Sequence, residues 1–272
     1  MISNDSHRKD RTLMLRLDSY KLKWIAIICM VLFHIIYPWQ DTLPLNAMIP
    51  LSIAGGVTFP IMAYFVVEGY KHTSNLKAYM KRLAIFGLIS MPFHFIVFDM
   101  MRFNIMFTII VSLFCLVLYD NVKSKPVFWT LFILISNLTA LFFDWFAFGP
   151  LIVLLYYIIK NETARRLMPG IVAGILWFLT GAFTLWGLNG MYELYEMGTS
   201  MAVNARFGID MIYAMIGNAY VVESSMYLII GSFIGALLVF GYNGERGKRM
   251  KWLFYSFYPI HLAALVVLPL IL

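Results

Sequence analysis

The stretch Lys21-Leu-Lys-Trp-Ile-Ala-Ile-Ile-Cys-Met-Val-Leu-Phe-His-Ile-Ile-Tyr-Pro-Trp39 is an apolar run with two lysines at its start and one histidine, His34, in its interior. The hydrocarbon core of a bilayer is about 30 Å thick and takes about 20 helical residues to cross. The run therefore predicts a transmembrane helix. Lys23 and His34 are about three helical turns and ~16 Å of rise apart, so they share one face, with the lysine at the membrane edge and the histidine near the midplane.

The spacing of Lys23 and His34 has two interpretations. An ionisable side chain inside a membrane is expensive and indicates a functional site by default. A basic anchor at the rim with a base below it suits an acyl-CoA threaded in from the aqueous side. Alternatively, Lys23 snorkels to the interface and His34 forms a hydrogen bond to a neighbouring helix. The spacing alone leaves both interpretations open.

The composition places the whole chain in the membrane class. Of its 272 residues, 61% are hydrophobic and 13% are charged, whereas a soluble domain is about half apolar and about a quarter charged. We expect one membrane domain over residues 22–272, preceded by a polar cytoplasmic segment, 1–21, without a cleavable signal peptide. The net charge of +7 does not indicate nucleic-acid binding, because the basic residues lie in short links between apolar runs.

The apolar runs predict an all-α, polytopic helical bundle. Full spans are expected at about 22–39, 47–69, 83–101, 104–119, 127–143, 145–159, 169–188, 224–242 and 252–271. Residues 190–222 are expected to form an external loop with an amphipathic or re-entrant helix. This gives nine full spans, or ten if 206–222 also crosses the membrane. Gly170–Gly174 and Gly231–Gly235 have the spacing of helix-packing faces.

The distribution of basic residues predicts the orientation. Cytoplasmic links of membrane proteins are enriched in Lys and Arg. With the N-terminus in the cytoplasm, all of the 21 Lys and Arg residues except Arg102 and Arg206 lie on the cytoplasmic side. We therefore expect a multi-pass protein of the cell membrane with a cytoplasmic N-terminus and an external C-terminus.

Three histidines are expected at similar depth in the membrane. Helical rise places His34 and His261 about 15 Å from the cytoplasmic edge of the membrane, and it places His94 slightly deeper. A histidine has a pKa near neutrality and is the usual general base for acyl transfer. Two imidazoles at one depth indicate a catalytic pair, with His261 orienting His34 or carrying a second proton. The alternative is a set of core histidines in separate helix contacts.

Other polar residues have a functional and a structural interpretation each. Glu68 can orient a base or pair with Lys71, and the pairing is favoured because it lies among lysines. Asp144 lies at an outer turn, where an Asp is often only a helix cap. Asn104 and Thr108, one turn apart, can bond a substrate or a neighbouring helix. No metal-binding spacing or hydrolase motif is present, so no metal cofactor is expected.

Several motifs together resemble those of a known family. They are Phe59-Pro60-Ile-Met-Ala-Tyr-Phe-Val-Val-Glu68-Gly69-Tyr70-Lys71-His72-Thr73, then Tyr79-Met-Lys81-Arg82-Leu83, Phe103-Asn104-Ile-Met-Phe107-Thr108, Asp144-Trp-Phe-Ala-Phe-Gly149 and Tyr258-Pro-Ile-His261-Leu262. The sequence resembles the TraX family, named for a conjugative-plasmid protein that acetylates the N-terminus of pilin. The resemblance covers most of the chain and is weakest over 165–245.

The resemblance implies a membrane acyltransferase that uses acetyl-CoA or another acyl-CoA as donor. It implies a general base at His34, and cytoplasmic contacts to the CoA phosphates from Lys23, Lys71, His72, Lys81 and Arg82. The acceptor would be an amine or hydroxyl of an extracytoplasmic or membrane-associated peptide, glycan or lipid-linked molecule. Within this scheme the substrate-contacting candidates are His94, Asn104, Thr108 and Asp144.

Two departures from the family pattern keep other functions open. The family usually has Asp before the first-span histidine, where this chain has Phe33, and often Gly-Arg in the second span, where this chain has Gly55-Gly56. The loss of an acid and a cation fits an inactive relative that acts as a membrane assembly factor. A transporter or flippase is a further alternative, although internal repeats, which would favour it, are not evident.

Overall fold

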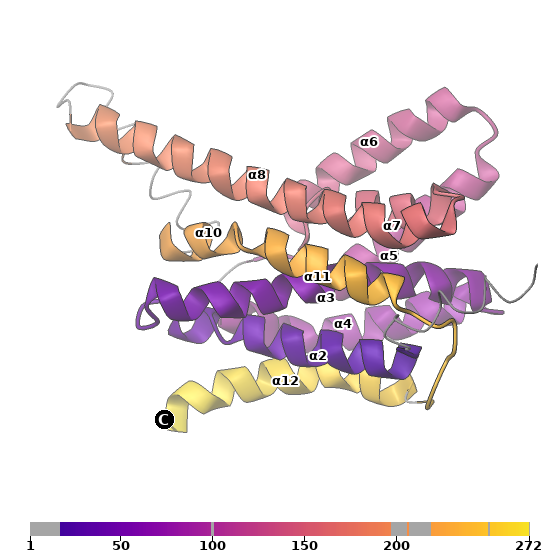
Figure 1. The fold of residues 1–272 in the computed structure, drawn as a ribbon, viewed down its shortest axis with the longest axis horizontal. Helices are drawn as coiled ribbons and strands as arrows, with labels where there is room; N and C mark the ends of the chain where they lie inside the picture. The colour runs from indigo at the N-terminus through magenta and orange to yellow at the C-terminus, as the bar shows by residue number, and fades with distance from the viewer. Residues whose placement is uncertain (1–16, 99–100, 197–205, 207–218, 250, 272) are drawn as a thin grey trace, which may run out of the picture.

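The computed structural model describes residues 17–98, 101–196, 206, 219–249 and 251–271, and these form a helical bundle (Figure 1). Its helices are α2 (Ser19–His34), η1 (Tyr37–Trp39), α3 (Leu45–His72), α4 (Leu76–Phe98), α5 (Ile105–Asn121), α6 (Lys125–Phe142), α7 (Phe148–Ile158), α8 (Glu162–Glu196), α10 (Ala219–Ser225), α11 (Leu228–Phe240) and α12 (Lys251–Ile271). Within these ranges there is no β-strand, and the only bridges are two isolated pairs of residues. The predicted all-α class is confirmed.

Seven of the described helices are long and apolar enough to cross a membrane. The prediction of nine full spans is not confirmed, because α5 and α7 are shorter apolar helices of 17 and 11 residues. At 1.5 Å per residue α7 rises only about 16 Å, roughly half of a hydrocarbon core. Residues 190–196, expected in an external loop, continue α8 instead, and most of the remainder of that loop lies outside the described residues.

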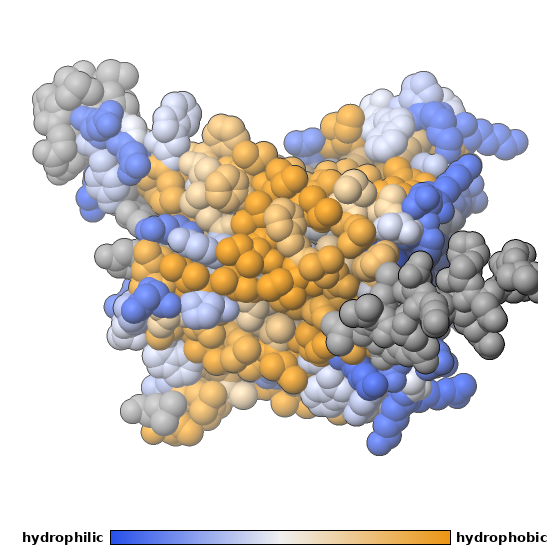
Figure 2. Space-filling view, in the orientation of Figure 1, coloured by the Kyte–Doolittle hydropathy of each residue, from blue (hydrophilic) through white to orange (hydrophobic). Residues whose placement is uncertain are grey.

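Consecutive helices run in alternating directions, except that α10 and α11 run the same way, so the bundle has two distinct ends. One end, which we call the basic end, holds the start of α2 and the link between α11 and α12. There Leu17 pairs with Tyr242, and the Asp18 carboxylate accepts a 2.8 Å bond from the Lys21 N–H, which starts α2 at Ser19. Figure 2 shows a hydrophobic band across the middle of the bundle, with hydrophilic residues gathered toward its ends.

Glycines allow α3, α8 and α11 to pack closely. A Cβ placed on Gly231 of α11 would collide with the Ile53 carbonyl and lie 2.8 Å from the Gly56 Cα of α3. A Cβ on Gly170 of α8 would lie 2.8 Å from the Ala236 Cβ of α11. The predicted packing role of the two glycine pairs is confirmed.

Two connections meet partway along the bundle rather than at one of its ends (Figure 1), and we call this meeting point the inner junction. The α4–α5 link and the α6–α7 link are joined by backbone bonds from Phe103 N–H to Phe142 O, 2.8 Å, and from Asp144 N–H to Phe103 O, 2.9 Å. Trp145 and Phe146 follow with φ of 64° and 47°, left-handed conformations that cost non-glycine residues about 1–3 kcal/mol each. Because α7 is short, this junction lies within the length of the membrane-spanning helices. Irregular backbone is tolerated there only when it is buried in protein or lines a cavity.

Candidate active site

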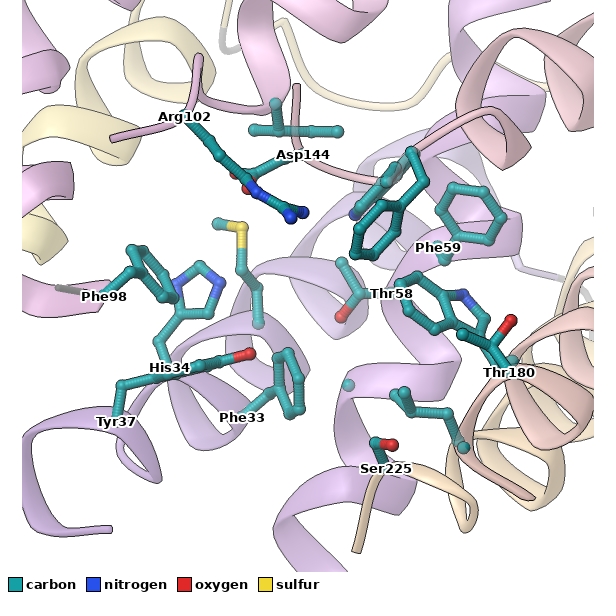
Figure 3. Close-up of a pocket in the computed structure, with 18 of the residues that line it drawn as sticks. Phe33, His34, Tyr37, Thr58, Phe59, Phe98, Arg102, Asp144, Thr180 and Ser225 are labelled. Atoms are coloured by element: carbon teal, nitrogen blue, oxygen red, sulfur yellow. The ribbon is translucent and has the colours of Figure 1, made fainter. Parts of the chain in front are cut away.

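The inner junction forms one wall of a cavity of about 200 Å³ (Figure 3). The other walls come from α2, α3, α8 and the region of α10 and α11. Its apolar lining includes the aromatic residues Phe33, Phe59, Phe98, Trp145, Phe146 and Trp177, and its polar lining includes His34, Tyr37, Thr58, Arg102, Asp144, Thr180 and Ser225. The cavity is thus mostly apolar, with a few polar groups facing inward, as is typical of small-molecule sites.

His34 and His261 form a hydrogen-bonded pair beside this cavity. The His34 Nδ1 lies 2.9 Å from the His261 Nε2, and the rings stack with centroids 5.1 Å apart. The His261 Nδ1 lies 3.1 Å from the Phe257 carbonyl oxygen. The two predicted imidazoles therefore do meet, even though 227 residues separate them.

The bonding pattern assigns the tautomers of both neutral rings. A carbonyl oxygen can only accept, so the His261 Nδ1 carries the proton and donates it to Phe257. The His261 Nε2 is then the acceptor, and the His34 Nδ1 donates to it. A neutral imidazole has one N–H and one lone pair, which leaves the lone pair of His34 on Nε2. This assignment follows from the hydrogen-bond network.

A third histidine, His94, contacts Asp144. The His94 Nε2 lies 2.9 Å from the Asp144 Oδ2, and the His94 side chain is only 1% exposed. The Thr108 hydroxyl donates a 2.6 Å bond to the Asp144 carbonyl oxygen. Asp144 is not the helix cap that its position suggested, because α7 begins after Ala147. Instead, its carboxylate is bonded to a neighbouring helix and lies in the cavity wall.

Asn104 has a structural role in this junction. Its Nδ2 donates a 2.8 Å bond to the Gly87 carbonyl, and its Oδ1 accepts a 3.1 Å bond from the Met106 N–H at the start of α5. Of the two interpretations of Asn104 and Thr108, the structure supports the contact to a neighbouring element for both.

Glu68 lies far from the histidine pair. It is about 15 Å along α3 from Thr58 of the cavity, by helical rise, so it does not orient His34. Its carboxylate contacts Arg165 of α8 at 3.1 Å and His72 at 3.6 Å, so the observed ion-pair partner is Arg165 rather than Lys71. The reason is that α8 begins at Glu162, earlier than expected, which buries the Arg165 guanidinium beside α3.

The predicted donor-binding residues lie toward the basic end and do not line the cavity. Lys23 Nζ lies over the rings of Phe65 and Phe254, 4.9 and 5.4 Å from their centroids. Lys23 contacts Phe254 and His34 contacts His261, and both of these partners belong to α12. Lys23 and His34 therefore lie on the same face of α2, as predicted. Lys71 lies over Tyr157, Arg82 approaches the Tyr255 hydroxyl at 3.4 Å, and Lys81 and His72 are exposed.

Sequence reasoning did not select Arg102, which lines the cavity next to Asp144. Its guanidinium lies over the Phe146 ring, 4.6 Å from the centroid. A signal was available, because Arg102 is one of only two basic residues that depart from the positive-inside pattern.

Close packing surrounds both positions at which this chain departs from the family pattern. A Cβ placed on Gly55 would lie 2.5 Å from the Cγ atom of the Phe33 ring, so Phe33 occupies the space beside this glycine. A side chain at Gly56 would collide with the Leu228 carbonyl and the α11 backbone. An arginine therefore has no room at position 56 while α11 packs this closely on α3.

These features define a helical membrane protein with a histidine pair beside a mostly apolar cavity. The family model described as "TraX protein" matches residues 19–269, and the chain therefore belongs to the TraX family. It is also similar to the probable fimbrial assembly protein FimC, serogroup H1, of Dichelobacter nodosus. The two are 27% identical over 267 residues, which cover 91% of this chain and 94% of FimC. No solved structure matches this chain.

Proposed function

We propose that this protein is a membrane acyltransferase that moves an acyl group, preferably acetyl, from acyl-CoA to an amine or hydroxyl of an acceptor. The observation that carries the proposal is the tautomer of His34. Its Nδ1 proton is committed to His261, and its Nε2 lone pair is left for a substrate in the adjoining cavity. A base that is held in one tautomer and orientation by a second group is the arrangement that proton transfer to an imidazole requires.

The reaction follows from this geometry. The acceptor O–H or N–H gives its proton to the His34 Nε2 while its oxygen or nitrogen attacks the thioester carbonyl. The carbon–sulfur bond then breaks, and the CoA thiolate takes the proton back from His34. His261 stabilises the transient imidazolium, because its Nε2 accepts the Nδ1–H bond, which strengthens when His34 is charged. Positioning and general-base catalysis supply the acceleration.

The donor would enter from the basic end, which we place in the cytoplasm on the positive-inside argument. Lys23, Lys71, Lys81 and Arg82, with His72, would make charge-assisted contacts to the CoA phosphates. The ~16 Å of rise between Lys23 and His34 is a distance that an extended thioester arm can bridge. The cavity would receive the acceptor.

The acceptor class follows from the relatives. Because FimC is named as a probable fimbrial assembly protein, we propose an acceptor among surface-fibre subunits or the peptide, glycan or lipid-linked molecules that assemble with them in the cell membrane. A second candidate is an assembly factor without catalysis. It is favoured by Phe33, which puts an apolar ring beside His34 where the family has an acid.

The experiment is acyl transfer by purified protein in lipid nanodiscs supplied with radiolabelled acetyl-CoA and a fimbrial subunit peptide. His34→Ala should lower turnover by ~10²–10⁴, the usual contribution of a general base. Thr130→Ala, at an exposed position of α6, serves as the matched control and should keep full activity. A folded His34→Ala protein with undiminished turnover would refute the assignment. Wild-type protein that supports fibre assembly without CoA release would favour the assembly factor.

A further inference from the structure

Arg102 is a charged side chain at membrane depth that the proposed chemistry does not use. It follows α4 in the inner junction, and Figure 3 shows its guanidinium directed into the cavity. Placing a cation at this depth is costly, and such residues usually mark a ligand or ion site.

The internal partners of Arg102 leave its donors available. Among the described residues it forms no ion pair or hydrogen bond, and its guanidinium lies over the face of Phe146, 4.6 Å from the ring centroid. A guanidinium stacked on a ring still presents its N–H groups at the edge. Asp144 lies nearby and lessens the cost of the buried charge, but its Oδ2 is bonded to His94 rather than to Arg102.

The chemistry of the guanidinium selects the kind of ligand. Its planar fork of N–H donors matches the two oxygens of a carboxylate or phosphate. The remaining walls are aromatic, and the volume of about 200 Å³ suits a group the size of one or two amino-acid side chains. A ligand that satisfies both parts has a compact apolar body and an anionic oxygen group.

We propose that Arg102 is an anion subsite that binds a carboxylate or phosphate of the acceptor, close to the nucleophile that His34 activates. Phe146 and the inner junction hold the guanidinium, and the aromatic walls hold the apolar part of the acceptor. The role of this subsite in choosing the acceptor rests on the proposed acyl transfer. The binding of the anion itself does not.

The binding test uses the full-length protein in nanodiscs and three probes: 3-phenylpropionate, its neutral analogue 3-phenylpropionamide, and phenyl phosphate. Calorimetric titration should show that at least one anionic probe binds about 10- to 100-fold more tightly than the amide, the ratio expected for a charge-assisted bond. Arg102→Gln should abolish this preference, and Arg102→Lys should keep part of it. Arg249→Gln, which removes an exposed cation of the α11–α12 link, should leave it intact.

Each outcome bears on the subsite separately from the enzyme. Preference for the carboxylate or for the phosphate identifies the anion, and equal binding of all three probes to wild-type protein overturns the proposal. Equal preference in wild type and Arg102→Gln also overturns it. If Arg102→Gln does not fold, the wild-type and Arg102→Lys titrations decide. Arg102-dependent binding without any acyl transfer would retain the subsite and reject the acyltransferase. Acyl transfer that is unaffected by Arg102→Gln would retain the acyltransferase and reject the role of the subsite in choosing the acceptor.

Discussion

The packing of α11 between α3 and α8 predicts a large difference between two Gly→Ala substitutions. Gly231 and Gly187 both lie inside helices, but only Gly231 faces a neighbouring backbone, and nothing lies within 4 Å of a Cβ on Gly187. In Gly231→Ala the new methyl would lie 2.8 Å from the Gly56 Cα, where ordinary contact begins at 3.4 Å. The helices must therefore separate by at least about 0.6 Å, and the clash with the Ile53 carbonyl demands more.

Overpacking of this kind costs about 1–3 kcal/mol. For a chain of this size each kcal/mol lowers Tm by roughly 2–4 °C, so Gly231→Ala should melt about 2–12 °C below wild type. Gly187→Ala should be neutral or raise the free energy of unfolding by up to about 1 kcal/mol, because alanine favours helix over glycine. Thermal unfolding in one detergent, followed by intrinsic fluorescence, measures both. Equal stability of the two variants would show that the α3–α11 contact is not as close as described.

Three further results are expected. His261→Gln should retain more acyl transfer than His261→Ala, because a glutamine oxygen can still accept the His34 Nδ1–H bond; equal loss in both would contradict the tautomer assignment. One alanine inserted between Trp24 and Phe33 rotates Lys23 against His34 by about 100°, so turnover should fall as far as in His34→Ala, with matched expression and Tm as controls. In a background without native cysteines, a membrane-impermeant thiol reagent applied to intact cells should label Cys at Asp41 but not at Lys77, and labelling at Lys77 would reverse the orientation.

The approximate positions of the helices could be predicted from the sequence, because the membrane makes them a local property. A backbone in hydrocarbon must satisfy its own hydrogen bonds, so a long apolar run becomes a helix irrespective of its neighbours. Helical periodicity likewise placed Lys23 and His34 on one face. The glycine pairs were recognisable for the same reason, since small residues at one-turn spacing mark a helix face whatever packs on it.

The partners of the polar residues were decided by the tertiary structure. Whether His34 bonds His261, whether Glu68 pairs with Lys71 or Arg165, and whether Asp144 caps α7 or bonds His94 depend on which helices become neighbours. Hydropathy indicates that a segment lies in the membrane. It does not indicate which helices pack together, because lipid tails are as apolar as leucine and an apolar helix face can contact either.

The cavity depended most on tertiary structure. Arg102 and Asp144 come together because the α4–α5 link and the α6–α7 link are hydrogen-bonded through the Phe103 backbone. The two helices that begin after these links, α5 and α7, are shorter than the membrane-spanning helices. In the sequence both residues look like ordinary ends of membrane spans. Charge and hydropathy therefore determined that this is a membrane bundle with a histidine inside it. Only the packing of distant segments determined that the histidine faces an arginine-lined cavity, because that contact depends on long-range pairing and not on local pattern.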